Sequence, residues 1–189
     1  METKEFTSFL DHQLFNNRTI LVNGPVDSQL AETINRQLLA LDLSAPDKPI
    51  TMMINSPGGE VHSGFSIFDT AKFIRPKLIT IVSGLAASMG SVLALCASKE
   101  NRYAFPNARL LIHQPLIGGV IRGQASDIDI HAKDIIKTRQ QINELYAKET
   151  GKSVEEIAKL TDRDYWLTAE DALKLGLISK IIQKASELK

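Results

Sequence analysis

The chain has 189 residues, of which 43% are hydrophobic and 23% are charged, as is typical of a globular protein. Its 22 basic residues balance its 22 acidic ones, so no excess positive charge favours nucleic acid or an anionic membrane as a partner. The single cysteine excludes an internal disulfide, and the length suits one domain over residues 1–189. We see no signal peptide and no apolar run long enough to span a membrane, and we expect a cytoplasmic protein.

Apolar strands and segments of helical periodicity alternate along the chain. In chain order we expect a strand over 19–23, a helix over 29–41, a strand over 49–55, a helix over 63–74, a strand over 78–83 that ends at Gly84, a helix of small residues over 86–97, and a strand over 109–113. Strand–helix units in series are typical of parallel β-structure with crossover helices. The predicted fold class is therefore α/β.

Residues 126–151 are predicted to form one long helix. Ser126 can cap its start and Gly151 can end it. At 1.5 Å per residue such a helix would be about 36 Å long. Two interpretations remain open: a surface helix packed along its length, or a projecting helix whose spare apolar face belongs to a partner subunit. Further on, Thr168-Ala-Glu-Asp171 is a capping pattern that predicts a last short helix.

Ser88 lies where a buried strand is expected to turn into a helix, within Gly84-Leu-Ala-Ala-Ser-Met-Gly90. The unpaired N–H groups and the positive end of the helix dipole at such a turn favour a developing oxyanion. The loop Asn55-Ser-Pro-Gly-Gly59 could supply a second N–H donor. Each motif also has an ordinary interpretation, because serine often caps a helix and Pro-Gly often makes a turn. Together they predict a candidate site for acyl transfer.

A serine nucleophile needs a base, and the base needs a group that orients it. His113, at the end of an apolar strand, is the preferred base, ahead of His62, which follows the glycine loop. Asp162 and Asp164 both lie in a polar segment between predicted helices. The spacing alone does not choose between these two carboxylates.

The other two histidines are poorer candidates for chemistry. His12 lies in a polar N-terminal stretch. Asp127 and His131 share a face of the long helix, but no third ligand is in view. We therefore expect no metal site.

Several long motifs resemble the proteolytic subunit of Clp protease, ClpP. They are Ile54-Asn-Ser-Pro-Gly-Gly59, Gly84-Leu-Ala-Ala-Ser-Met-Gly90, Pro106-Asn-Ala-Arg-Leu-Leu-Ile-His-Gln-Pro115, Gly123-Gln-Ala-Ser-Asp-Ile-Asp-Ile-His-Ala132 and Thr161-Asp-Arg-Asp-Tyr165. The resemblance runs from about residue 18 to 182. It implies the ClpP/crotonase fold, a spiral of β-β-α units with a projecting handle helix. It also implies an ATP-dependent serine endopeptidase that cleaves unfolded proteins inside an oligomeric chamber.

Carried over position by position, the resemblance makes Ser88 the nucleophile, His113 the general base and Asp164 the orienting carboxylate. The backbone N–H groups of Gly59 and Met89 correspond to the family's oxyanion hole. The resemblance implies neither a metal nor a cofactor.

The resemblance also implies an assembly of two stacked heptameric rings, fed by a hexameric Clp ATPase of the ClpX or ClpC type. The handle, about 116–150, comprises a strand and the long helix and would join the two rings. The positions that correspond to inter-ring contacts are Gln124, Asp129 and Arg163. The positions that correspond to the ATPase-docking pocket are Thr51, Met53 and Phe73.

Three departures from the family pattern support an alternative. Compared with the family, the N-terminal segment, about 1–17, is short by roughly the part that forms the axial gating loops. Thr51 and Met53 stand where the family often has tyrosines, and the stretch 115–123 is two residues longer than its counterpart. These differences favour a weakly active or regulatory paralogue that works in a mixed assembly with a second ClpP. A crotonase-type acyl-CoA enzyme is a third hypothesis, which the Ser-Met-Gly and His-Gln-Pro motifs disfavour.

Overall fold

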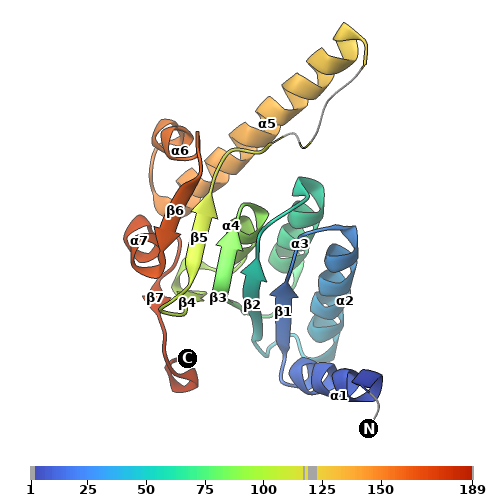
Figure 1. The fold of residues 1–189 in the computed structure, drawn as a ribbon. Helices are drawn as coiled ribbons and strands as arrows, with labels where there is room; N and C mark the ends of the chain where they lie inside the picture. Colours follow the sequence, from blue (N-terminus) through green and yellow to red (C-terminus); the bar gives the residue numbers. More distant parts are fainter. Residues whose placement is uncertain (1–2, 117, 119–122, 189) are drawn as a thin grey trace.

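The computed structural model describes residues 3–116, 118 and 123–188, with helices packed around a mostly parallel sheet (Figure 1). The elements are α1 (Thr3–Asn16), β1 (Thr19–Asn23), α2 (Ser28–Ser44), β2 (Ile50–Ser56), α3 (Val61–Phe73), β3 (Leu78–Ala87), α4 (Met89–Ala94), β4 (Arg102–Ala104), β5 (Arg109–Ile112), α5 (Ala125–Thr150), α6 (Val154–Leu160), β6 (Tyr165–Thr168), α7 (Ala169–Leu175) and β7 (Lys180–Ile181), with single 3₁₀ turns at Lys99–Asn101 and Ala185–Glu187. The predicted α/β class is confirmed.

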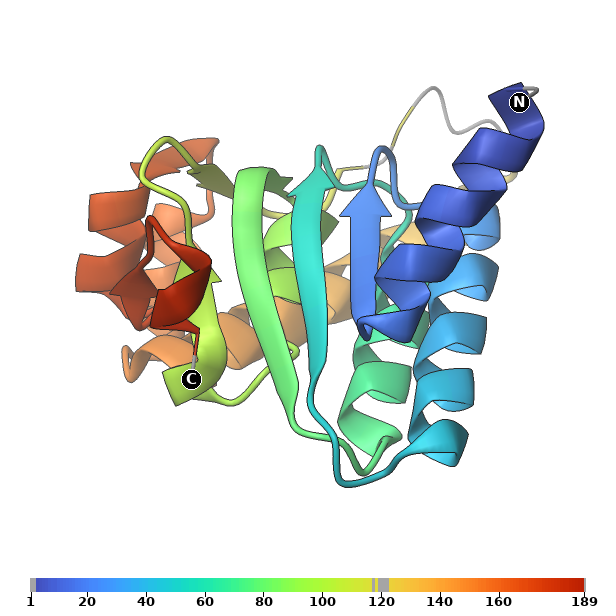
Figure 2. The ribbon, with the colours of Figure 1, turned by 90° about the horizontal axis from the view of Figure 1, so that it is seen from below.

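The described strands form one seven-stranded sheet. Strands β1, β2, β3, β4 and β7 follow one another across it, and all these neighbours are parallel. The long strand β3 changes partner along its length, because Thr80–Val82 pair with β4 while Leu85–Ala87 pair with β5. Strand β6 adds to β5 in the antiparallel direction. Helices α2, α3 and α4 lie on one face of the sheet, and α1 lies beside β1 (Figure 2).

The strand predicted over 78–83 does not end at Gly84. It continues to Ala87, and the following helix begins at Met89 and ends at Ala94, so both predicted boundaries were wrong. A Cβ at Gly84 would lie 2.7 Å from the side-chain oxygen of Asn55, and the N–H of Leu85 donates to that oxygen at 3.0 Å. Gly84 therefore allows a close approach within the sheet and does not end the strand.

Helix α5 has two different halves. Its carboxyl half is packed, with Ile142, Asn143, Tyr146 and Ala147 buried, and it ends at Gly151, whose φ is +75°. Its amino half stands away from the sheet (Figure 1) and exposes three isoleucines. These are Ile128, Ile130 and Ile136. The packed interpretation thus holds for the carboxyl half, and the amino half projects, while its contact with a partner subunit stays a prediction. The predicted handle strand falls mostly on residues 117 and 119–122, outside the described part of the chain.

None of the helices in the described ranges is both long and apolar enough to cross a membrane.

Candidate active site

Ser88 lies at the sharp turn between β3 and α4. Its φ is +53° and its ψ is −123°, a backbone conformation that costs free energy for any residue with a side chain. The turn is held by a hydrogen bond from the N–H of Ser88 to the carbonyl of Leu111 on β5, at 3.0 Å. A serine on a strained strand-to-helix turn is the arrangement that presents a nucleophile in α/β-hydrolases.

The pairing of the strands brings His113 and Asp164 together. In the antiparallel β5–β6 pair Ile112 is opposite Tyr165, so the next residues on either side, His113 and Asp164, also face each other. The Nδ1 atom of His113 lies 3.1 Å from Oδ1 of Asp164, and its Nε2 atom lies 2.8 Å from Oγ of Ser88. Three side chains from separate parts of the chain therefore form one line of hydrogen bonds.

Asp162, the other carboxylate that the sequence left open, faces elsewhere. The side-chain amide of Gln114 donates to the backbone carbonyl of Asp162 at 2.8 Å, and Arg163 lies 3.6 Å from the Asp162 carboxylate. The structure thus places Asp164, and not Asp162, against the imidazole of His113.

The glycine loop packs directly against the Ser88 turn. Gly58 has a φ of +87°, and a Cβ there would lie 2.6 Å from Cβ of Ser88 and 2.9 Å from N of Met89. Within the described residues, the N–H groups of Gly59 and Met89 have no hydrogen-bond partner. Both are therefore free to donate to a substrate oxygen near Ser88. Gly58 was not among the site residues predicted from the sequence, although its place in the Gly58-Gly59 pair was a usable signal.

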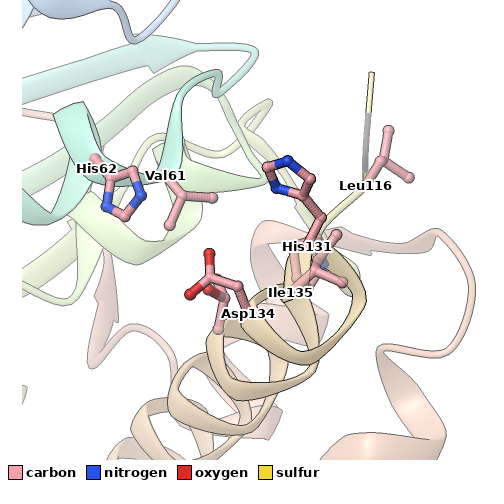
Figure 3. A pocket seen from close by; sticks show the side chains of 8 residues that line it. Val61, His62, Leu116, His131, Asp134 and Ile135 are labelled. Carbon is pink, nitrogen blue, oxygen red and sulfur yellow. The ribbon is translucent and has the colours of Figure 1, made fainter. Parts of the chain in front are cut away.

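A cavity of about 350 Å³ lies between the start of α3, the residues that follow His113, and helix α5 (Figure 3). Its lining comes from the residues just after the glycine loop, those just after His113, and the exposed half of α5. The apolar members are Val61, Pro115, Leu116 and Ile135, and the polar members are His62, His131, Asp134 and Thr138. His62 and His131 thus belong to this cavity and not to the hydrogen-bonded line at Ser88. Among the residues that the structure describes, no three His, Cys, Asp or Glu side chains are grouped to hold a metal ion.

The residues predicted for assembly lie on the surface. Gln124 is exposed before α5, Asp129 lies 2.6 Å from Lys133 on the same helix, and the side chain of Arg163 is 86% exposed. Their inter-ring role stays a prediction.

The three residues predicted for ATPase docking are not all together in this chain. Thr51 and Met53 line a cavity of about 270 Å³, together with Ile81 and Phe105. Phe73 lies outside it, 79% exposed at the end of α3. A single subunit therefore brings two of the three into one pocket.

The family model for Clp protease matches residues 3–185. The chain belongs to the Clp protease family. The ATP-dependent Clp protease proteolytic subunit 1 of Protochlamydia amoebophila is 49% identical over 179 residues, which cover 95% of this chain and 87% of that protein. The subunit 1 of Chlamydia muridarum is 46% identical, over 95% of this chain and 93% of the relative. The subunit 1 of Chlamydia caviae is 43% identical over 187 residues, which cover 99% of this chain and 98% of that protein.

Membership in this family makes the chain a ClpP paralogue and implies a peptidase. The predicted resemblance is confirmed, and the acyl-CoA hypothesis gains no support from any of these relatives.

Proposed function

We propose that this chain is a serine endopeptidase, the proteolytic subunit of an ATP-dependent Clp protease that degrades unfolded proteins in the cytoplasm. The observation that carries the proposal is the line of hydrogen bonds from Ser88 through His113 to Asp164. The nucleophile contacts the base, and the base contacts the orienting carboxylate, each within the hydrogen-bond distance that acyl transfer needs.

In the proposed mechanism, Oγ of Ser88 attacks the carbonyl carbon of a peptide bond while Nε2 of His113 takes the hydroxyl proton. The carbonyl oxygen becomes an oxyanion that accepts hydrogen bonds from the N–H groups of Gly59 and Met89. The C–N bond then breaks, and His113 gives its proton to the leaving amine. Water, activated by the same imidazole, attacks the acyl-enzyme and releases the acid. Asp164 accepts a hydrogen bond from the Nδ1–H group of His113 and so holds the tautomer in which Nε2 is free to act as the base.

The apolar cavity gives this mechanism a place for a substrate side chain. Val61 lies two residues after Gly59, and Pro115 lies two residues after His113, so two walls of the cavity continue directly from segments that carry the site. We assign it to the side chain that precedes the scissile bond. Its apolar walls, formed by Val61, Leu116 and Ile135, favour an apolar residue there.

The proposal includes an assembly of two stacked heptameric rings with a hexameric Clp ATPase of the ClpX or ClpC type. The relatives are named as subunits of an ATP-dependent protease, which supports an ATPase partner. The amino half of α5 exposes apolar residues that are available to an opposite ring, and Gln124, Asp129 and Arg163 are exposed as such contacts require. Docking of the ATPase would use the pocket at Thr51 and Met53, with Phe73 supplied by a neighbouring subunit.

A second candidate is a weakly active paralogue that functions in a mixed assembly with another ClpP. The observation that favours it is the number in the relatives' name, proteolytic subunit 1, which presupposes another subunit.

One experiment tests both candidates. Hydrolysis of a fluorogenic peptide with an apolar residue before the cleaved bond is measured for the purified protein, alone and with a second ClpP plus Clp ATPase. Activity of the isolated protein that disappears in Ser88→Ala supports the first candidate. Ser88-dependent activity in the mixed assembly alone supports the second. If the activity of the isolated protein survives Ser88→Ala, or if no activity that depends on Ser88 appears either alone or in the mixture, the serine-peptidase proposal is wrong. His113→Ala should be about as damaging as Ser88→Ala, and the double variant should lose little more.

A further inference from the structure

Two buried hydroxyl groups lie behind the Ser88 turn. Ser91 on α4 and Tyr146 on α5 are each 1% exposed, and their oxygens lie 2.7 Å apart. The Ser91 hydroxyl donates to the backbone carbonyl of Ser88 at 2.6 Å. A hydroxyl has only one proton to donate, so Tyr146 must be the donor to Ser91. Burial raises the pKa of the Tyr146 phenol, which therefore keeps the proton that it donates.

This chain of hydrogen bonds ends on a peptide unit that matters for the proposed chemistry. The Ser88 carbonyl also accepts from the N–H groups of Ser91, at 2.9 Å, and Val92, at 3.3 Å. The same planar peptide carries the N–H of Met89, and in a trans peptide the carbonyl and the N–H point in opposite directions. Groups that hold the carbonyl on the helix side therefore aim the Met89 N–H away from the helix, where Gly58 lies.

Hydrogen bonds to a carbonyl also polarise its peptide unit, which strengthens the N–H at the other end as a donor. The conformation of Ser88, with its φ of +53°, needs this kind of support from its surroundings to persist. The side chains of Ser91 and Tyr146 thus act on both the orientation and the donor strength of the Met89 N–H.

We infer that Ser91 and Tyr146 are positioning residues, which fix and polarise the Ser88–Met89 peptide so that the Met89 N–H stabilises the oxyanion. The inference rests on the proposed serine-peptidase function, since it assigns the Met89 N–H to the oxyanion hole. Tyr146 belongs to the packed half of α5, the helix whose other half projects from the fold. The orientation of the Met89 N–H group therefore depends on how the packed half of α5 is positioned.

The first test needs no activity. Ser88–Met89 is the only Ser-Met dipeptide in the sequence, so protein labelled with ¹³C-carbonyl serine and ¹⁵N-methionine gives one backbone cross-peak, from this peptide. We expect Tyr146→Phe and Ser91→Ala to move this peak, because each change weakens hydrogen bonding at the Ser88 carbonyl. The matched control is Thr80→Val, which removes a buried hydroxyl that donates to Ala94 at the other end of α4, at 2.8 Å. It should leave the peak in place.

The second test is kinetic. Loss of one neutral hydrogen bond predicts that kcat falls about three- to tenfold in Tyr146→Phe, with a somewhat larger fall in Ser91→Ala. KM and the midpoints of the pH–rate profile should not change, because neither variant touches His113 or the apolar cavity. Tyr146 acts through Ser91, so the double variant should be no slower than Ser91→Ala alone. Thr80→Val should keep the kcat of the unmodified protein.

An unmoved cross-peak in both Tyr146→Phe and Ser91→Ala would overturn the inference, whatever the activity. A fall of kcat in Thr80→Val equal to that in Tyr146→Phe would also overturn it, because general loosening of α4 would then be the cause. If the peak moves as expected while the unmodified protein hydrolyses nothing in any assembly, the positioning of this peptide stands and the proposed function fails.

Discussion

His113 and Asp164 form a hydrogen bond of 3.1 Å although their side chains differ greatly in exposure, 13% for the histidine and 63% for the aspartate. Within one subunit, the carboxylate that faces the imidazole is thus open to water. Solvent weakens the attraction between an exposed carboxylate and its partner. In the proposed mechanism Asp164 would therefore act mainly by orienting the ring of His113, with a modest electrostatic contribution.

Asp164→Asn should therefore lower kcat by about 10²-fold, less than the 10⁴-fold known for a buried triad aspartate. The reason for the loss is that an amide can stabilise the wrong tautomer of His113. Asp162→Asn is the matched control and should retain nearly full activity, because Asp162 contacts Gln114 and Arg163 instead. Steady-state hydrolysis of a fluorogenic peptide measures both variants. Equal losses of kcat in the two variants would show that either substitution disturbs residues 162–164 in the same way, and that Asp164 has no specific role.

Gly58→Ala should abolish activity and lower stability. Its added Cβ would lie 2.6 Å from Cβ of Ser88, and the φ of +87° disfavours any side chain. Gly24→Ala provides the control, because Gly24 has a similar φ of +83° but has no atom within 4 Å of the added Cβ. It should cost about 1 kcal/mol of unfolding free energy and leave kcat unchanged. Chemical denaturation and peptide hydrolysis measure the two effects, and an active Gly58→Ala protein would contradict the packing of the loop against Ser88.

Arg102→Ala should be strongly destabilising. Arg102 is 1% exposed, donates to the carbonyl of Ala97, and pairs with Glu149 at 2.6 Å. Removing one partner of a buried pair leaves the other charge uncompensated, at a cost of about 3–5 kcal/mol. The exposed pair of Arg36 and Glu32 on α2 is the control, and Arg36→Ala should change stability very little. Similar unfolding midpoints in guanidinium for the two variants would refute the importance of the buried pair.

Cys96 should resist thiol reagents in the folded protein. Burial raises the pKa of its thiol to about 12, so almost no reactive thiolate exists at pH 8. Iodoacetamide at pH 8 should modify Cys96 only after the protein has been unfolded in guanidinium, as intact mass would show. Modification of the native protein at the rate of a free peptide thiol would mean that the segment that follows α4 opens readily.

The elements that could be predicted from the sequence are those with long apolar patterns. Strands β1 and β2 and helices α2 and α3 agree with their predictions to within a few residues. The short strands β4, β6 and β7 were not predicted, because two to four residues cannot show a period; β5, also four residues long, was predicted from its three apolar residues and the Gln114-Pro115 pair that follows. Arg102 also begins the buried strand β4, where a charged residue argues against burial until Glu149 is known to lie beside it.

The residues of the candidate site also fall into two groups, those that local sequence patterns predict and those that they do not. Ser88, His113 and the glycine loop could be proposed from local patterns, because each stands where a buried strand ends. The choice between Asp162 and Asp164 depends on the pairing of β5 with β6, which local spacing does not reveal. The Ser91–Tyr146 contact joins residues 55 positions apart, and nothing local marks either residue. Long-range pairing therefore decides which residues meet at the site.

The measurement that tests the central claim most directly is covalent labelling of Ser88. The purified protein is treated with a fluorophosphonate probe, alone and with a second ClpP plus Clp ATPase, and the modified residue is mapped by mass spectrometry. We predict an adduct on Ser88, absent from Ser88→Ala and strongly reduced in His113→Ala, because the base raises the reactivity of the hydroxyl. If Ser88 carries no adduct in any of these mixtures, the hydrogen-bonded line from Ser88 to Asp164 is not a working catalytic site.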